Sequence, residues 1–252
     1  MAKAWDAYRN NFKAIAGIGI AATILVIGLE IAGMGIFTAY VALFANILAY
    51  KVIEKNVSWR KTAIQAFWGW ISQIIIAIGV VLALIIAAIP AMLAGTAGIA
   101  IAIMLFLVVL VALLRFIFVP YFAHKGYGVI DIIKKSWQRG WGPAIVAGIE
   151  TLLVIFVAMI AAGTILFPVG VDAVHSMKTV LAQAQWTTPS AARAIVYKTA
   201  VTTITTPRNL TLELLATAVY GAIIPLAWLI VYFGGKGGEN EASVGETAEK
   251  MA

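Results

Sequence analysis

The chain has 252 residues, of which 63% are hydrophobic and only 12% are charged, and its formal net charge is +7 at pH 7. A soluble domain carries about 25% charged residues, so this composition and a mean hydropathy of +0.99 exclude a soluble globular protein. The apolar residues form continuous runs, without the alternation that is typical of membrane β-strands. We therefore predict an all-α polytopic membrane helix bundle.

Apolar runs of about 20 residues, the length that crosses a bilayer, predict six spans. The first run, 14–50, would be about 55 Å long as one helix. We therefore divide it into a hairpin that turns in the glycine-containing stretch 30–35. Prolines bound most of the other spans. The predicted spans, residues 14–30, 33–50, 70–89, 99–119, 143–167 and 210–233, make one transmembrane domain, 1–233.

Two further segments complete the chain. The insert 169–209 contains Thr-Pro pairs at 188–189 and 206–207, which are typical of a helix cap followed by proline in the first turn. Between 172 and 185, an apolar stripe is formed by Val174, Met177, Val180 and Leu181. We expect two short amphipathic helices, the first in this stretch and the second after Thr188, that lie over the bundle end as a cap or as a lid. The tail 234–252 is rich in glycine and charged residues, and we predict that it is a disordered cytoplasmic tail.

Three segments, each directly before a span, combine cations with aromatic residues at helical spacing: "AWDAYRNNFK", "WRKTAIQAFWGW" and "IDIIKKSWQRGW". Such helices place aromatic rings at headgroup depth and cations toward anionic phosphates. We therefore predict three hairpins, each preceded by a basic aromatic interfacial helix. The segments are either ordinary flanks of spans or a collar that gathers anionic lipid. The residues expected to face lipid are Tyr8, Phe12, Trp68, Lys134, Lys135, Trp137, Arg139 and Trp141.

The distribution of lysine and arginine predicts the orientation. Basic clusters occur at the N-terminus, after the second span and after the fourth span, whereas the short turns near 30–36 and 90–98 have none. The positive-inside rule then places both termini in the cytoplasm, with the protein in the cell (plasma) membrane. The insert 169–209 also carries cations and is an exception to this pattern, which longer translocated segments tolerate.

The stretch "RFIFVPYFAHKGYGVIDIIKKSWQRGWG" resembles a pattern in a loose prokaryotic polytopic membrane family. The family includes the membrane region of bacterial glycerophosphodiester phosphodiesterases and related stand-alone proteins of unknown function. In it, a span that ends in arginine and aromatic residues leads to a helix with a basic-Ser-Trp core. The resemblance covers about residues 110–150 and implies a six-span membrane module with a lipid-related role, without a catalytic site. The matching residues are Arg115, Phe116, Pro120, Lys135, Ser136 and Trp137.

Four polar residues lie within different predicted spans at similar depth. Arg115 lies about 7 Å and Glu150 about 10 Å inside the cytoplasmic edge, and Asn46 and Gln73 lie in the same layer. Because an unpaired intramembrane charge is costly, we expect Arg115 and Glu150 to pair. The cluster is either a structural ion pair or a polar vestibule for a substrate. Glu30 and Glu213 lie at the opposite ends of their spans, where we expect water to reach them.

The sequence contains no cysteine, two histidines and no nucleotide-binding, metalloprotease or hydrolase motif. We therefore expect no enzyme activity, no metal and no cofactor. The favoured function is a non-catalytic membrane scaffold or accessory module that organises lipid or a partner complex. The alternative is a transporter or channel for a small solute, ion or lipid through the polar layer around Arg115 and Glu150. The expected partners are anionic membrane lipids and a second membrane protein, not nucleic acid. The sequence indicates no oligomeric state.

Overall fold

The computed structural model describes residues 1–93, 95–184 and 205–251, and every element in these ranges is a helix. Six helical stretches are long and apolar enough to cross a membrane: Phe12–Ile31, Gly35–Ile53, Trp59–Met92, Gly95–His124, Trp141–Ser176 and Pro207–Gly237. The prediction of an all-α polytopic bundle is confirmed. The elements are α1 (Ala2–Asn10), α2 (Phe12–Ile31), the 3₁₀ turn η1 (Gly35–Phe37), α3 (Thr38–Ile53), α4 (Trp59–Leu93), α5 (Gly95–Leu113), the 3₁₀ turn η2 (Leu114–Phe118), α6 (Val119–His124), α7 (Val129–Gln138), α8 (Trp141–Ala184) and α10 (Pro207–Met251).

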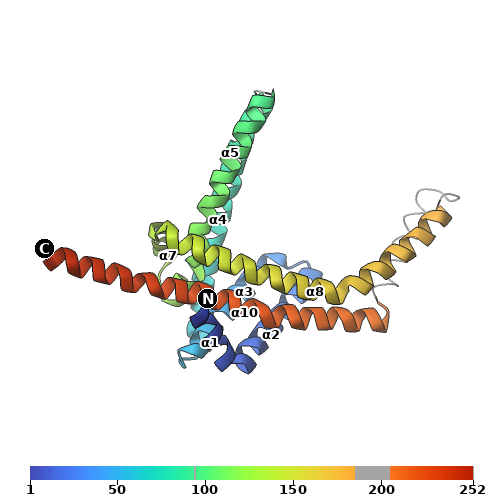
Figure 1. Cartoon of the computed structure of the whole chain (residues 1–252), viewed down its shortest axis with the longest axis horizontal. Coiled ribbons are helices and arrows are strands. Elements are labelled where there is room, and N and C mark those ends of the chain that lie inside the picture. The colour runs from blue at the N-terminus through green and yellow to red at the C-terminus, as the bar shows by residue number, and fades with distance from the viewer. Residues whose placement is uncertain (94, 185–204, 252) are drawn as a thin grey trace.

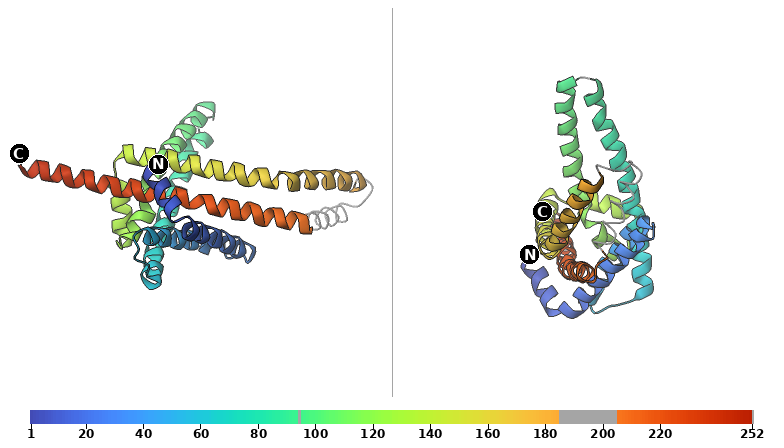
Figure 2. Two further views of the ribbon diagram at one scale, coloured as in Figure 1. Left: turned by 60° about the horizontal axis from the view of Figure 1, so that its bottom comes forward. Right: turned by 90° about the vertical axis from the view of Figure 1, so that its right-hand side faces the viewer.

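The long helices form three hairpins, α2–α3, α4–α5 and α8–α10, whose members pack against each other (Figure 1). The hairpins meet at a base, which consists of α1, η2, α6, α7 and the adjoining ends of the long helices. The end of each hairpin far from the base is its tip. The α4–α5 hairpin projects from the base across the direction of α8 and α10, and the end-on view in Figure 2 shows this arrangement clearly. Away from α4, α5 packs only on η2 in the described residues.

The helix α10 is central, because it contacts α1, α2, α3, α6, α8 and η2. It approaches α2 closely where two glycines meet. A Cβ atom added at Gly19 would overlap the Gly221 carbonyl oxygen and the ring of Pro225, and one at Gly221 would lie 2.8 Å from the Cα of Ile20. Tyr8 of α1 donates a hydrogen bond to the carbonyl oxygen of Ala222 beside this crossing. Small residues therefore set how closely α2 and α10 pack, as in many membrane helix pairs.

The second predicted interfacial helix does not exist as a separate element. Its residues form the first turns of α4, which runs without interruption from Trp59 to Leu93. Gly69 does not break the helix, because it lies where Leu43 and Ala123 pack closely on the backbone. Pro90, which was expected to end the span, lies inside the helix. Prolines are tolerated in membrane helices, where neighbouring groups satisfy the freed carbonyl.

The fourth predicted span, 99–119, is a composite. The α-helix ends at Leu113, a 3₁₀ turn follows, and Pro120 opens α6 in its first turn. The missing proline N–H is tolerated in the first turn of a helix, where it would have no acceptor within the helix, so Pro120 favours a helix start at this position. The apolar stretch therefore continues to His124 and carries Arg115 on the 3₁₀ turn.

The start of the insert also differs from the prediction. The first helix expected within 169–209 is a continuation of α8 past Pro168 to Ala184, with Asp172 inside the helix. The second expected helix lies outside the described residues. The Thr206–Pro207 start is confirmed, since the Asn209 N–H donates to Thr206 Oγ1 at 3.4 Å at the start of α10. The helix α10 continues from 234 to Met251.

Candidate functional site

Arg115 lies in the base, where it joins η2 to α7 and α8. Its Nη1 donates a hydrogen bond of 2.6 Å to the carbonyl oxygen of Trp137, in the last turn of α7. The guanidinium carbon lies 3.9 Å from the ring centroid of Trp141 and 5.1 Å from that of Trp137. A cation at the C-terminus of a helix satisfies a carbonyl that has no partner within the helix. Arg115 therefore fastens three elements together.

The predicted pair of Arg115 and Glu150 does not form. Glu150 instead lies beside the amino group of Met1, with an N···O distance of 3.2 Å. The reason is the position of the two residues along α8: Arg115 stacks on Trp141, and Glu150 follows that tryptophan by nine residues, or about 13 Å along the helix axis. The similar depths of Arg115 and Glu150 were estimated from the ends of their predicted spans. That estimate did not include the 3₁₀ turn η2, which places Arg115 near the start of α8.

The two other residues of the predicted polar layer lie on different helices. Asn46 is buried in α3, and Gln73 is half-buried in α4. No hydrogen bond or ion pair in the described part of the chain joins any two of the residues Asn46, Gln73, Arg115 and Glu150. The four residues therefore do not assemble into one site.

The residues expected to face lipid fall into three groups. Phe12, Trp68, Lys134, Trp137 and Trp141 are exposed. Lys135 and Arg139 are half-buried on the protein surface. Lys135 Nζ lies 4.5 Å from the ring centroid of Tyr127, and Arg139 donates to the carbonyl oxygens of Gly234 and Gly235 in α10.

Tyr8, in contrast, is only 7% exposed. It packs on α10, because its hydroxyl finds an acceptor in the Ala222 carbonyl. Burial away from water raises the pKa of its hydroxyl. The expectation that Tyr8 faces lipid is wrong.

A polar cluster that the sequence did not indicate lies where α3, α6 and α10 meet. His124 Nε2 lies 3.0 Å from Glu54 Oε2, and the Tyr232 hydroxyl donates to Glu54 Oε1 at 2.7 Å. The rings of Tyr50 and Tyr121 surround the cluster, with centroids 4.8 Å and 6.0 Å from that of Tyr232. One carboxylate therefore connects three helices through hydrogen bonds in a mainly aromatic environment.

The electrostatics of this cluster favour an ionised Glu54. Burial raises the pKa of its carboxyl group, but the hydrogen bond from Tyr232 and the interactions with His124 and Lys125 outweigh burial, so the pKa is lowered overall. The backbone carbonyl of His124 accepts a hydrogen bond of 2.7 Å from Gln65 Nε2 of α4, which brings a fourth helix to the cluster. In the part of the chain that the structure describes, no third acidic or histidine side chain joins Glu54 and His124 to make a metal site.

The base also carries a series of cations over aromatic rings. Besides the Arg115 and Lys135 contacts, Arg139 lies 5.3 Å from the ring centroid of Phe118 and Lys125 5.5 Å from that of Tyr121. Lys236 of α10 lies 5.9 Å from the ring centroid of Tyr232. These contacts come from η2, α6, α7, α10 and the segments that join them, and they concentrate positive charge at the base.

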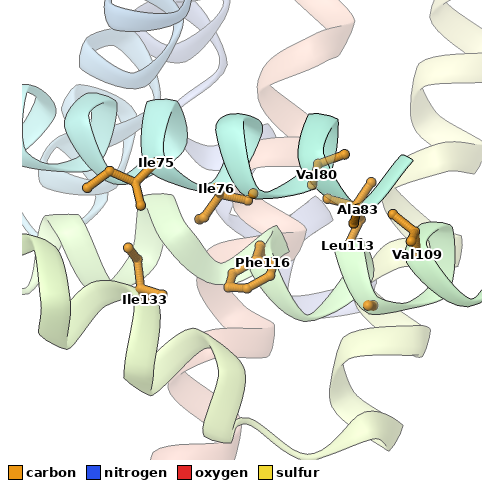
Figure 3. A pocket seen from close by; sticks show the side chains of 10 residues that line it. Ile75, Ile76, Val80, Ala83, Val109, Leu113, Phe116 and Ile133 are labelled. Carbon is orange, nitrogen blue, oxygen red and sulfur yellow. The ribbon is translucent and has the colours of Figure 1, made fainter. Parts of the chain in front are cut away.

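An apolar pocket of about 290 Å³ lies next to the base, between α4, α5, η2 and α7 (Figure 3). Ile75 and Ile76 form one wall, Phe116 and Ile133 close it toward the base, and no side chain in its lining is polar. The ring of Phe116 is also 5.7 Å from that of Trp137, so the pocket lies close to the Arg115 contact. Its lining suits a hydrocarbon chain and offers nothing to a polar solute.

The helices and their apolar surfaces define an all-α polytopic integral membrane protein. Comparison with models of known protein families, with curated proteins and with solved structures finds no match for this chain.

Proposed function

We propose that the protein is a non-catalytic integral membrane module of the cell membrane that gathers anionic lipid around its base, with both termini in the cytoplasm. The observation that carries the proposal is the concentration of cations on aromatic rings at the base. A cation held over a ring keeps its charge near the membrane interface, where aromatic residues prefer to lie. Anionic lipid phosphates lie at the same depth.

The position of α7 supports this assignment. Its Ile132 and Ser136 are fully buried against the protein, whereas Ile130 is 79% and Trp137 46% exposed. Lys134 is exposed on the same helix. A helix with one face fixed to protein and a second face presenting apolar residues and lysine suits the headgroup region of a bilayer. The apolar pocket of Figure 3 lies directly behind α7 and could accept part of a lipid chain.

The alternative, transport through a polar layer around Arg115 and Glu150, rests on the repeated hairpins and on four polar residues, and no hydrogen bond or ion pair joins any two of those four in the described part of the chain. The described residues supply no other observation that favours it. The proposed module would act by holding lipid, or a membrane protein partner with an acidic surface, at its base.

The proposal is tested by lipid selectivity. The protein is reconstituted into vesicles that contain equal amounts of phosphatidylcholine and phosphatidylglycerol, extracted mildly, and analysed for retained lipid by native mass spectrometry. We expect retained phosphatidylglycerol to exceed phosphatidylcholine. The variant Lys134→Gln with Lys135→Gln should lose most of this preference. As a matched control, Lys178→Gln with Arg208→Gln removes the same amount of positive charge at the tip. This variant should keep the preference for phosphatidylglycerol. Equal retention of the two lipids by the wild type, or equal losses in both variants, would refute the proposal.

A further inference from the structure

A second cavity lies at the opposite end of the molecule from the base. It has a volume of about 740 Å³ and is bounded by α2, α8 and α10 near their tips. This volume is within the range of about 300–1,000 Å³ that is typical of small-molecule sites. Ile24 and Ile27 of α2 and Leu166 of α8 line it, and α10 contributes Glu213 and Thr217.

The helix packing accounts for the position of this cavity. α2 and α8 both pack on α10, but in the described residues they do not pack on each other. The close approach of Gly19 and Gly221 holds α2 against α10 at one level. Farther toward the tip, α2 presents isoleucine side chains instead of glycine, so α2 and α10 lie farther apart and leave a groove between them. The helix α8 closes this groove from the other side.

Glu213 is the one ionisable residue in the lining of this cavity. It takes part in no hydrogen bond or ion pair in the described part of the chain, and it lies within the apolar stretch Pro207–Gly237. Arg208, five residues earlier on α10, is already engaged with Asp172 of α8 at 3.4 Å. The Thr217 side chain lies one helical turn from Glu213 in the same lining and adds a second polar group. Glu213 is half-buried among the apolar residues of the lining, and a carboxylate without a partner in such a place favours a cation as its counterpart.

We propose that this cavity binds an amphipathic organic cation, in which an ammonium or similar centre carries apolar substituents. Glu213 neutralises the cationic centre, and the isoleucine and leucine side chains cover the apolar substituents. The same chemistry occurs in two sources: a soluble hydrophobic cation, or the amine headgroup of a membrane lipid. An anion of the same size and shape would be repelled by Glu213, so charge selectivity is the distinguishing property of the site.

The experiment uses the whole protein in detergent and two probes of matched shape, the tetraphenylphosphonium cation and the tetraphenylborate anion. Equilibrium binding of each radiolabelled probe is measured at pH 7, with empty micelles as the blank. We expect saturable binding of the cation and none of the anion above the blank. Glu213→Gln should weaken cation binding by on the order of tenfold or more. Glu30→Gln, which removes an exposed carboxylate at the tip of α2 outside the cavity, should leave it unchanged.

A second pair of variants makes the test independent of the charge change. Gly170 lines the cavity, and no atom lies within 4 Å of a Cβ placed there, so Gly170→Leu should fill the cavity without disturbing the fold. Gly163, on the same helix and with equally open surroundings, is outside the lining. We expect Gly170→Leu to reduce cation binding and Gly163→Leu to preserve it.

The two sources are separated by repeating the cation titration in nanodiscs. If the natural ligand is a lipid amine, phosphatidylethanolamine nanodiscs should compete with the probe and phosphatidylglycerol nanodiscs should not. If the natural ligand is a soluble cation, the affinity of the protein for the probe should be the same in the two kinds of nanodisc. Either result supports the site. Binding of the cation that is no stronger than that of the anion, or that is unaffected by both Glu213→Gln and Gly170→Leu, would overturn the proposal.

Discussion

The guanidinium of Arg115 lies on the ring of Trp141, with 3.9 Å between the guanidinium carbon and the ring centroid. The same side chain donates to the carbonyl oxygen of Trp137. Arg115 thus connects the end of the α5–η2 segment to α7 and to the start of α8. Together with the packing of α4 on α3, α6 and α7, this contact holds the α4–α5 hairpin at the base.

The first prediction is that Arg115 is coupled to Trp141 and not to Glu150. A double-mutant cycle with Arg115→Ala and Trp141→Leu should give a coupling free energy of about 0.5–2 kcal/mol, because the cation lies on a partly desolvated ring. The corresponding cycle with Glu150→Gln should give less than about 0.5 kcal/mol, as for separated sites. Both are measured by unfolding in detergent. Trp68→Leu serves as a control, because that exposed tryptophan makes no contact with Arg115. A larger coupling to Glu150 than to Trp141 would contradict the structure.

The second prediction concerns the crossing of α2 and α10. Gly19→Ala places a methyl group against the backbone of Gly221 and the ring of Pro225. Neither can move easily, so the helices must separate, and we expect a loss of about 1–3 kcal/mol in the free energy of unfolding. Gly17→Ala is the matched control, because no atom lies within 4 Å of its added Cβ. Alanine favours the helix more than glycine does, so this variant should be neutral or up to about 1 kcal/mol more stable. Equal effects of the two variants would disprove the close contact.

The third prediction is an acid-dependent loss of stability that depends on Glu54. The folded protein holds the pKa of Glu54 below its ordinary value of 4.5. The contribution of the ionised carboxylate is therefore complete above this pH and is lost as the pH falls through the lowered pKa. Thermal unfolding in detergent between pH 7 and pH 3 should show a smaller acid-induced decrease for Glu54→Gln than for the wild type.

Tyr232→Phe tests the cause of the lowered pKa. The variant removes the 2.7 Å hydrogen bond to Glu54, which is one of the interactions that lower the pKa of the carboxyl group. The acid-induced loss of stability should therefore be smaller than in the wild type and should be complete at a higher pH. An identical pH profile for the wild type and Glu54→Gln would show that the cluster does not contribute.

The fourth prediction is the orientation in the membrane. The chain has no native cysteine, so single cysteines can be introduced without background. Asn56 lies at the base and Thr96 at the tip of the α4–α5 hairpin, and both are exposed. With the base in the cytoplasm, an impermeant maleimide applied to intact cells should label Thr96→Cys and not Asn56→Cys. The reverse pattern would invert the topology.

The sequence predicted the helical class, the number of apolar spans and their pairing in hairpins, because these follow from long hydrophobic runs and basic flanks. The boundaries were less accurate. Pro90, Pro168 and Pro120 were each taken as the end of a span, but the first two lie inside helices and the third opens a new one. Proline restricts the local backbone, while the surrounding membrane helices determine whether a helix continues.

The candidate site was harder to predict, because it depends on contacts between distant segments. Glu54 and His124 both lie beside lysines in polar connections, which gave no sign that they meet. The partner of Arg115 depended on the 3₁₀ turn, which its position along the predicted span did not reveal. Gly19 lies on α2 and Gly221 on α10, and the sequence of neither helix alone indicates that the two glycines meet.

The central position of α10 has a consequence for how the protein is made. This helix follows every other described helix in the chain, yet it contacts α1, α2, α3, α6 and α8. Until it leaves the ribosome and enters the membrane, Gly19 has no helix against it and Tyr8 has no acceptor in α10. The helix α5, by contrast, packs on α4 and η2, its direct neighbours in the chain. Biogenesis should therefore pass through a partly assembled state, in which the earlier helices are inserted but await the last one, and in which membrane chaperones and proteases have access to the unfilled α2 surface.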